Sequence, residues 1–381
     1  MTLSNRKILR TLLCLLAGTL YAVCLSACDA KEPLSENRDA EIESPVIAND
    51  LSNQKVTAIA EDTQGHIWIG TFRGLNKNNV HDYHQYFCTD DSLGLPDNQI
   101  THLLRDSKNR FWVGTVNGVC LYTDKDNFRI IPIEADNKNV RQILEDRNGR
   151  IFLNTGFQLY AYHPREEKIT CVLPEISPGN AFYAQCHIAP DNNLWVMTST
   201  GLRCYDPSTL QLKESVALSG YPYYSYLHNN ELWITGNHTL SIFDTRTHSF
   251  KPLPQPIAHN TTLCNADIDY IHPYGNNGLL LNTARHGMFY YNPGTGSVTR
   301  QDENGFPFEM PRFRISRMFT DSQQNLWIGS VDQGYTVCYH YKERFNNDNY
   351  LRSELNNKSV VSLSAGKDHK LWISTLMDGI Y

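Results

Sequence analysis

The sequence lacks several features that would assign it to a common class of protein. No block of Lys or Arg marks a nucleic-acid surface, and a net charge of −6 over 381 residues names no partner by itself. No C-x-x-C pair, H-E-x-x-H, G-x-S-x-G or P-loop occurs, so the usual metal, redox, hydrolase and nucleotide signatures are missing. We therefore expect no cofactor, no metal site and no nucleic acid as a partner.

Long apolar runs are also scarce, and the one that exists lies near the N-terminus. Three basic residues precede an apolar stretch at 12–26, which has the length of a secretory signal rather than of a membrane span. It ends in Leu-Ser-Ala-Cys, a lipobox-like sequence in which Cys28 would become the lipidated N-terminus. An ordinary signal peptide cut nearby, or an uncleaved anchor, is the alternative. Residues 1–28 therefore predict export and a membrane anchor.

Cysteine usage does not support a disulfide framework. Seven cysteines follow Cys28, and an odd number cannot all pair within one chain. Cys120, Cys204 and Cys338 each lie just after a repeated glycine, where we expect strands. We interpret them as small buried apolar side chains.

What the chain has instead is a repeated phrase. The stretch from Asp62 to Tyr83 has Ile-Trp-Ile at its centre, followed by a Gly-Thr pair and a Gly-Leu pair. The repeats are anchored, in chain order, on Trp68, Trp112, Phe152, Trp195, Trp233, Leu280, Trp327 and Trp372. Neighbouring anchors are about 38 to 47 residues apart, a period typical of a β-propeller.

Each of the first seven repeats contains four short strand candidates bounded by Gly, Asn, Asp or Pro. Seven repeats predict an all-β fold, a seven-bladed β-propeller of four-stranded antiparallel blades over residues 43–345. As a hypothesis, Glu43 to Ala48 supplies the last strand of the closing blade. Residues 29–42 are interpreted as a tether. Residues 346–381 are interpreted as a linker and a partial first blade of a second propeller, which we expect to be poorly packed.

The hairpin between the first two strands of each repeat has its own chemistry. An Asp lies six residues before the anchor in four repeats, and Gly or Asn lies three before it at 65, 109, 149, 192, 230 and 277. Gly and Asn tolerate positive φ, and Asp can accept hydrogen bonds from nearby backbone N–H groups. We therefore interpret the Asp residues as turn formers rather than catalytic acids, and the anchor side chains as packing between blades.

The combined phrase V-x-x-I-x-x-D-x-x-G-x-[IL]-W-[IV]-G-T-x-x-G-[LV] resembles the two-component regulator propeller repeat. The resemblance is strongest at Val56–Leu75, Ile100–Val119 and Ile315–Gly334, and it extends from near residue 46 to the C-terminus. The third, fifth and sixth repeats depart from the phrase because they lack the Trp or the leading Asp.

This resemblance implies the extracytoplasmic sensor of a hybrid two-component system from Bacteroides-type, Gram-negative bacteria. Such sensors are expected on the periplasmic side, to recognise oligosaccharides and to regulate polysaccharide utilisation. Full-length relatives add a second propeller, a membrane helix, a histidine kinase and further signalling domains. The present sequence has no kinase or receiver motif, so we expect no enzyme activity from it and interpret it as a fragment or a truncated gene product.

The loops before the first strand and between the second and third strands of each blade should gather on one face, around the central funnel. Aromatic, Arg and Asn side chains there suit a sugar, especially an acidic one. The candidate ligand-binding residues are Arg73, Tyr223, Arg285 and Arg312. Other polar or aromatic residues expected on this face are Asn117, Tyr183, Tyr224, His238, His286, Arg314 and Asp332.

Two other functions stay open at this point. One is a structural protein-interaction propeller without a small ligand. Its partner would be a second propeller or, in a homodimer, a second copy of the chain. The other is a propeller-fold polysaccharide lyase or hydrolase. Such an enzyme needs a positioned acid and base, and the spacing of His187, His238, His259 and His286 singles out no such pair.

Overall fold

The structure is a computed structural model. It describes residues 51–79, 82–89, 93–123, 126–176, 184–340, 358–366, 371–377 and 379–380. These residues belong to one compact unit, Pro45–Tyr381, whereas the other unit, Met1–Ser44, lies outside the described residues. The predicted signal peptide, the tether and the strand from Glu43 to Ala48 also lie outside the described residues.

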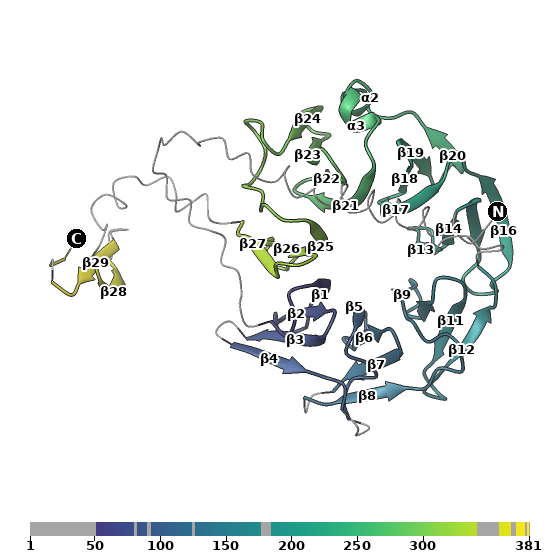
Figure 1. Ribbon diagram of the computed structural model, residues 1–381, viewed down its shortest axis with the longest axis horizontal. Helices are drawn as coiled ribbons and strands as arrows, with labels where there is room; N and C mark the ends of the chain where they lie inside the picture. Colours follow the sequence, from purple (N-terminus) through teal and green to yellow (C-terminus); the bar gives the residue numbers. More distant parts are fainter. Residues whose placement is uncertain are drawn as a thin grey trace, which may run out of the picture. The chain divides into compact units, whose positions relative to one another are not determined.

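Small antiparallel sheets follow one another along the chain, and each is one repeat (Figure 1). Blade 1 consists of β1 (Val56–Glu61), β2 (Ile67–Thr71), β3 (Gly74–Asn79) and β4 (Asp82–Tyr86). Blade 2 consists of β5 (Ile100–Arg105), β6 (Phe111–Thr115), β7 (Gly118–Tyr122) and β8 (Phe128–Ile131). Blade 3 consists of β9 (Gln142–Glu145), β10 (Ile151–Asn154), β11 (Leu159–His163) and β12 (Lys168–Leu173).

The second half of the propeller repeats this order. Blade 4 consists of β13 (Gln185–Ile188), β14 (Leu194–Thr198), β15 (Gly201–Tyr205) and β16 (Leu212–Ala217). Blade 5 consists of β17 (Pro222–His228), β18 (Glu231–Gly236), β19 (Thr239–Asp244) and β20 (Ser249–Lys251). Two short helices, α2 (Gln255–Ala258) and α3 (Thr261–Cys264), precede blade 6, which consists of β21 (Ile268–Tyr274), β22 (Gly278–Thr283), β23 (Gly287–Asn292) and β24 (Ser297–Arg300). Blade 7 consists of β25 (Ile315–Thr320), β26 (Leu326–Ser330) and β27 (Tyr335–Cys338).

The first strands of the blades form a closed cycle. Going round the ring, β1 contacts β5, and the contacts continue through β9, β13, β17, β21 and β25 back to β1. Figure 1 shows these strands around the centre and the fourth strands at the rim. The predicted all-β, seven-bladed propeller is therefore confirmed, and its closure protects sheet edges that would otherwise be exposed.

Blade 7 has three strands among the described residues and meets blade 1 directly. Ser322 donates to the Glu61 carboxylate through its backbone N at 2.7 Å and its Oγ at 2.6 Å. The backbone N of Gly334 donates to the carbonyl oxygen of Gln54 at 2.8 Å. Side chains from both blades share one buried apolar cluster, which includes Leu51, Val56, Ile69, Trp327 and Tyr335.

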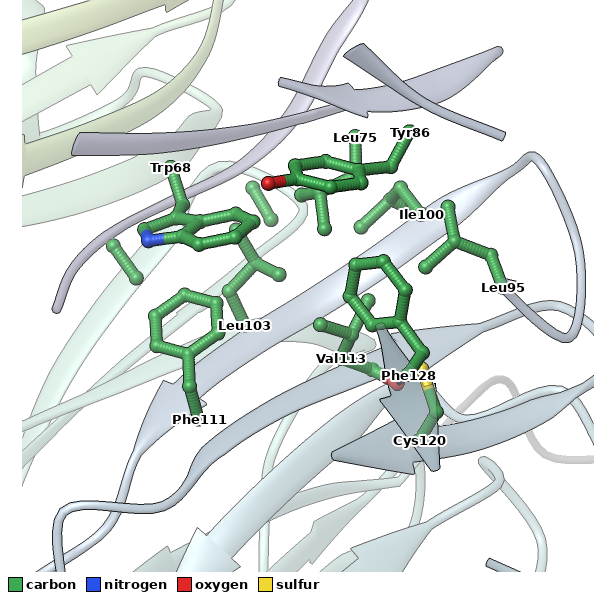
Figure 2. Packing of buried hydrophobic residues seen from close by; sticks show 12 residues of the cluster. Trp68, Leu75, Tyr86, Leu95, Ile100, Leu103, Phe111, Val113, Cys120 and Phe128 are labelled. Atoms are coloured by element: carbon green, nitrogen blue, oxygen red, sulfur yellow. Dashed lines mark hydrogen bonds between the residues drawn. The ribbon is translucent and has the colours of Figure 1, made fainter. Parts of the chain in front are cut away.

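The anchor side chains fill the wedges between neighbouring blades, as predicted. Trp68 of blade 1 packs on Phe111 of blade 2, with ring centroids 4.9 Å apart (Figure 2). It also packs on Tyr122 of blade 2, at 4.7 Å between ring centroids. Where the anchor is not Trp, the position is still fully apolar and buried, as at Phe152 and Leu280. A large flat ring buries the most apolar area per residue at such a wedge.

Glycine is required at two places in blade 1. Gly74 opens β3 with φ of 115°, a left-handed value that only Gly adopts readily. Gly70 lies against blade 2, and a Cβ there would be 2.5 Å from Cγ2 of Ile100. The first requirement allows the turn between the second and third strands, and the second allows close approach of two blades.

The predicted turn glycines and asparagines are confirmed except in blade 5. Positive φ occurs at Gly65, Asn109, Gly149, Asn192 and Asn277. In blade 5 the prediction for Asn230 is wrong, because the left-handed residue is Asn229, with φ of 56°. There His228 pairs with Glu231, so the hairpin turn has fewer residues than in blade 1, where Glu61 pairs with Ile67.

The eighth repeat is a strand pair, β28 (Val360–Ala365) and β29 (Leu371–Thr375). Its anchor, Trp372, is 52% exposed, whereas Trp68 is fully buried in blade 1. The expectation that this partial blade is poorly packed is confirmed. The seven cysteines after Cys28 are all free; Cys120 and Cys204 are buried as expected, and Cys338 is half-buried.

Candidate functional site

Two classes of loop lie side by side on one face of the propeller, which we call the loop face. These are the turns between second and third strands and the segments that lead into first strands. In blade 1 the backbone N of Phe72 donates to the carbonyl of Lys55 at 3.0 Å, and that of Gly74 donates to Asn98 of the next blade at 2.7 Å. The same bond joins Val331 to Arg314 in blade 7. The predicted gathering of these loops on one face is confirmed.

The four candidate ligand-binding residues all lie on the loop face. Arg73 is in the β2–β3 turn, Arg285 in the β22–β23 turn and Arg312 in the segment before β25, and all three are exposed. Tyr223 is near the start of β17 and is 41% exposed. They come from blades 5, 6, 7 and 1, which are consecutive around the ring. Tyr183, also expected on this face, lies outside the described residues.

Sequence reasoning missed a pair of carboxylates beside Tyr223. Burial, followed by the charges of Asp267 and Asp269, raises the pKa of Tyr223 to about 12. Desolvation raises the pKa of Asp269, against the hydrogen bond that Asn282 donates at 2.6 Å and the attraction of Arg314. Blades 5, 6 and 7 therefore bring a phenol, two carboxylates and a guanidinium into one neighbourhood.

The backbone explains why these side chains share a place. In blades 5 and 6 the pairing of the first two strands shifts by one residue, at Tyr223 and at Asp269. Such a β-bulge leaves one residue unpaired and re-aims its side chain. Tyr223 and Asp269 thus hold the same position in adjacent blades. The same shift occurs at the second residue of the first strand in blades 1, 2 and 7, so it belongs to the repeat, although single-residue preferences do not mark it.

Tyr224 was expected on the loop face but is used inside the ring. Its hydroxyl accepts from the backbone N of Ile271 and donates to the carbonyl oxygen of the same residue, both at 3.3 Å. Tyr270 makes the same pair of bonds to Met318 in blade 7. These residues link the first strands of neighbouring blades, so Tyr224 is structural.

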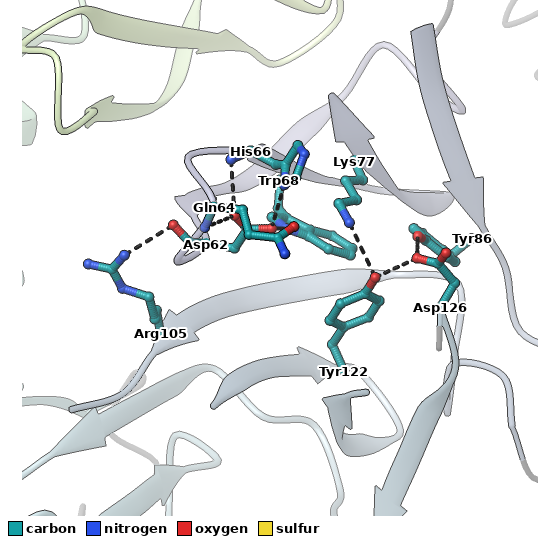
Figure 3. Close-up of polar contacts among 9 residues, drawn as sticks. All are labelled: Asp62, Gln64, His66, Trp68, Lys77, Tyr86, Arg105, Tyr122 and Asp126. Carbon is teal, nitrogen blue, oxygen red and sulfur yellow. Dashed lines mark hydrogen bonds and ion pairs between the residues drawn. The ribbon is translucent and has the colours of Figure 1, made fainter. Parts of the chain in front are cut away.

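The repeated Asp is a turn former, as predicted, and it also holds the anchor ring. Oδ1 of Asp62 accepts from the backbone N–H groups of Gln64 and His66 at 2.9 and 3.0 Å (Figure 3). Its Oδ2 accepts from Nε1 of Trp68 at 2.9 Å. Burial opposes ionisation, but these hydrogen bonds hold the pKa of Asp62 below its ordinary value.

The same bond recurs where both residues are present. Nε1 of Trp112 donates to Asp106 at 2.8 Å, and Nε1 of Trp327 donates to Asp321 at 2.9 Å. Blades 4 and 5 keep the Trp but have no Asp at this place. Among the described residues, Nε1 of Trp195 and Nε1 of Trp233 are buried without a hydrogen-bond partner.

Two further observations concern the described part of the chain alone. No group of three His, Cys, Asp or Glu side chains there is arranged to hold a metal ion. None of its helices has both the length and the apolar character that a membrane crossing needs.

Two buried histidines link neighbouring blades. Nε2 of His187 is hydrogen-bonded to Oγ of Ser225 at 2.8 Å, and Nε2 of His272 is hydrogen-bonded to Oγ1 of Thr320 at 3.0 Å. Both histidines therefore have a structural role.

The fold and loop face define a class, a seven-bladed propeller that presents variable loops on one face. Two stretches of the chain, residues 50–73 and 94–117, match the family described as the two component regulator propeller. These two stretches therefore match two-component regulator propeller repeats, and the predicted resemblance is confirmed at the first two of its three strongest copies. No curated protein sequence matches the chain.

Several solved structures share the fold of this chain. One is the extracellular domain of a protein described as a hybrid two component system from B. thetaiotaomicron, with 20% identity and a TM-score of 0.62 over 87% of this chain and 46% of that one. A second extracellular domain from B. thetaiotaomicron, described as a one component system, has 20% identity and a TM-score of 0.60 over 85% and 44%. This chain thus spans less than half the length of both.

An enzyme shares the fold more distantly. Virginiamycin B lyase from Staphylococcus aureus has 14% identity and a TM-score of 0.57, over 76% of this chain and 96% of the lyase. Identities this low establish the propeller fold and do not transfer an activity.

Proposed function

We propose that this propeller is the ligand-sensing part of an extracytoplasmic regulator and that its loop face recognises an oligosaccharide. The observation that carries the proposal is the neighbourhood of Tyr223, Asp267, Asp269 and Arg314, contributed by three consecutive blades. An aromatic ring can stack on a sugar ring, while carboxylate and guanidinium groups bind its hydroxyl groups. The extracellular domains of similar structure support a sensing role.

The exposed arginines of the loop face extend this neighbourhood. Arg285 follows Ala284, whose backbone N donates to the carbonyl of Asp267 at 2.9 Å. Arg312 precedes β25, two residues before Arg314. With Arg73 from blade 1 they supply three exposed guanidinium groups that can bind carboxylates, which favours an acidic oligosaccharide over a neutral one.

Calorimetry with two probes tests the proposal. Oligogalacturonate fragments should bind the wild-type chain more tightly than cello-oligosaccharides of the same length. The double variant Arg285→Ala, Arg312→Ala should weaken oligogalacturonate binding at least tenfold, about 1.4 kcal/mol or more. The matched control, Arg147→Ala with Arg165→Ala, removes the same charge from exposed turns between other strands and should bind normally.

Unchanged affinity in the loop-face variant would remove these arginines from the site. Absence of binding by either probe would contradict oligosaccharide recognition as stated and favour a structural interaction surface. Release of new reducing or unsaturated sugar ends by the purified chain would instead favour a lyase or hydrolase.

A further inference from the structure

One side chain per blade links the first strands of neighbouring blades, at a position that strand register makes equivalent. It is the residue two places before the partner of the anchor on the first strand. We call these seven positions the inner belt. In blades 2 to 6 the belt side chains are hydrogen-bonded to the backbone of the next blade, and they are His102, Gln142, Gln185, Tyr224 and Tyr270.

The bonds of the inner belt follow one rule. Each belt side chain accepts from the backbone N–H of the residue that directly follows the belt residue of the next blade. Oε1 of Gln142 accepts from Cys186 at 2.9 Å, and Oε1 of Gln185 accepts from Ser225 at 2.6 Å. A first strand has no neighbouring strand on its inner side, so the belt satisfies backbone groups that the sheet leaves unpaired.

Blades 7 and 1 break the belt. The belt residue of blade 7 is Arg317, and a guanidinium group has no acceptor for the N–H of Ile59 on blade 1. Nη1 of Arg317 instead donates to the carbonyl oxygen of the adjacent Ser316 at 2.8 Å. The belt residue of blade 1 is Ala58, whose side chain is a methyl group. The inner belt is therefore interrupted between blade 7 and blade 2.

The guanidinium group of Arg317 points toward the centre of the ring. Burial, followed by the charge of Arg317, lowers the pKa of His102 on blade 2 to about 4. Burial raises the pKa of Tyr224 on blade 5, and the charge of Arg317 opposes this rise. Blades 2 and 5 are each two places from blade 7, on opposite sides of it, and the first strands surround the centre (Figure 1). Arg317 is also exposed, so solvent reaches this level of the central channel.

The positive charge of Arg317 has no opposite charge beside it. The ion pairs of the described residues do not include Arg317. Burial and Arg317 are the two causes of the lowered pKa of His102, and neither is a carboxylate. Asp269, on the first strand of blade 6, has Arg314 as the cation that acts on its pKa. The break in the belt therefore leaves a guanidinium group available to an anion from the channel.

His102 adds a neutral donor on the other side of the break. Its Nδ1 accepts from the backbone N of Ile143 at 3.4 Å, and its low pKa keeps the imidazole uncharged near pH 7. A neutral imidazole whose Nδ1 accepts carries its proton on Nε2. With the guanidinium of Arg317 and the N–H of Ile59, this Nε2–H gives a set of donors suited to the oxygen atoms of an anion.

We propose that the break in the inner belt binds an oxyanion, such as a carboxylate or a phosphate, with Arg317 as its main ligand and His102 and Ile59 as further donors. The belt residues directly follow the bulge residues Tyr223 and Asp269, so the site lies just below the loop face. A free anion or the carboxylate of an acidic oligosaccharide can supply this chemistry. The site goes beyond the proposed function and does not require it.

Calorimetry with inorganic phosphate at low ionic strength tests the site, with sodium chloride of equal ionic strength as the comparison. Arg317→Gln removes the charge and supplies the belt residue of blades 3 and 4. It should weaken phosphate binding at least tenfold, about 1.4 kcal/mol or more. The matched control, Arg147→Gln, removes the same charge from an exposed turn of blade 3 and should bind phosphate as the wild-type chain does.

Two more variants keep the test decisive if Arg317→Gln fails to fold. Arg317→Met removes the charge without adding a belt residue and should lose phosphate binding to the same extent. Arg317→Lys keeps the charge and should bind phosphate more tightly than the Gln and Met variants. The proposal is overturned if the wild-type chain does not bind phosphate, if binding survives removal of the charge, or if the Lys variant binds no better than the uncharged ones.

Oligogalacturonate titrations in the presence of phosphate distinguish the two sources of the anion. If the oligosaccharide supplies the carboxylate, phosphate should weaken its binding to the wild-type chain and not to Arg317→Gln. If a free anion occupies the site, the two ligands should bind independently.

The same phosphate titration separates this site from the loop face. The Arg285→Ala, Arg312→Ala variant should keep phosphate binding whatever its effect on oligogalacturonate, so failure of one proposal is distinguishable from failure of the other. Loss of phosphate binding in that variant, with normal binding in Arg317→Gln, would place the anion on the loop face and overturn the inference.

Discussion

The wedges that follow blade 1 and blade 5 solve the same packing problem in different ways. After blade 1, Trp68 is held by Asp62, and Lys77 lies 5.2 Å from the centroids of both Trp68 and Tyr122 (Figure 3). Tyr86 and Tyr122 both donate to Asp126, which completes the network. After blade 5 the Trp is retained, but its polar partner and the long turn are missing and a cavity takes their place.

The difference shows that the two functions of the Asp are coupled. One carboxylate forms the hairpin turn and satisfies the indole, so losing it changes both the backbone and the hydrogen bonding. Apolar packing of the ring tolerates this loss, because Trp233 is as deeply buried as Trp68. A wedge can therefore lose the hydrogen bonds around its Trp while the ring of blades stays closed.

Lowering the pH should have the largest effect on stability, and it should affect the two wedges differently. Burial lowers the pKa of His187 and of His272 from 6.5 to about 4, and burial together with Arg317 does the same for His102. The unfolded chain therefore takes up protons first as pH falls, so stability present above pH 6.5 is lost between pH 6.5 and 4. For each histidine, every tenfold difference in proton affinity between the folded and unfolded chain changes the free energy of unfolding by at most about 1.4 kcal/mol.

Urea unfolding between pH 7 and 5 measures this effect, and we expect a loss of several kcal/mol in total. His187→Gln should flatten the dependence on pH, whereas His259→Gln, at an exposed site, should not. The wedge after blade 1 should be spared, because Asp62 titrates below its ordinary pKa of 3.8. Equal loss of hydrogen-exchange protection in β1–β2 and in β17–β18 at pH 5 would contradict this.

Removing the polar residue from each wedge should have unequal effects. Asp62→Ala leaves the indole N–H of Trp68 and two turn N–H groups without their acceptor, so the free energy of unfolding should fall by about 2–3 kcal/mol. His228→Ala removes a side chain whose Nε2 has no partner, and should cost about 1 kcal/mol or less. Urea titration at pH 7.5 compares them; similar losses would show that the hydrogen bonds of Asp62 contribute little.

The smallest effect isolates the indole hydrogen bond. Trp68→Phe and Trp233→Phe remove the same atoms from two buried rings, but only the first breaks a bond to a carboxylate. Trp68→Phe should therefore be more destabilising by about 1 kcal/mol. The measurement is again urea unfolding.

The anchor spacing and the turn chemistry were sufficient to predict the architecture. The Trp phrase predicted the blades and the buried anchors, because one large apolar residue per unit has to face the neighbouring unit. The absence of further strands predicted the poor packing of the eighth repeat. Counting residues failed in blade 5, where the shortened hairpin puts His228 in the place of the Asp. Pairing register, rather than distance along the chain, decides which residue faces the anchor.

The loop face was predictable in outline and not in detail. Topology places Arg73, Arg285 and Arg312 correctly, since turns between given strands always emerge at the same end of a propeller. It could not separate Tyr223 from Tyr224, which are neighbours in the sequence: Tyr223 is 41% exposed, whereas the hydroxyl of Tyr224 bonds to Ile271 inside the ring. The bulge at Tyr223 and Asp269 depends on backbone pairing across the sheet, and single-residue preferences do not encode it.

The contact between Ser322 and Glu61 joins residues that are 261 positions apart. During synthesis the edge of the first sheet therefore stays uncovered until nearly the whole propeller has left the ribosome. Each sheet can form locally and early, but the final joint carries the entropy of closing a very long loop. Folding should be slowest, and the chain most prone to aggregation, before blade 7 closes on blade 1. A chaperone that holds unfolded chains would be of most use at that stage.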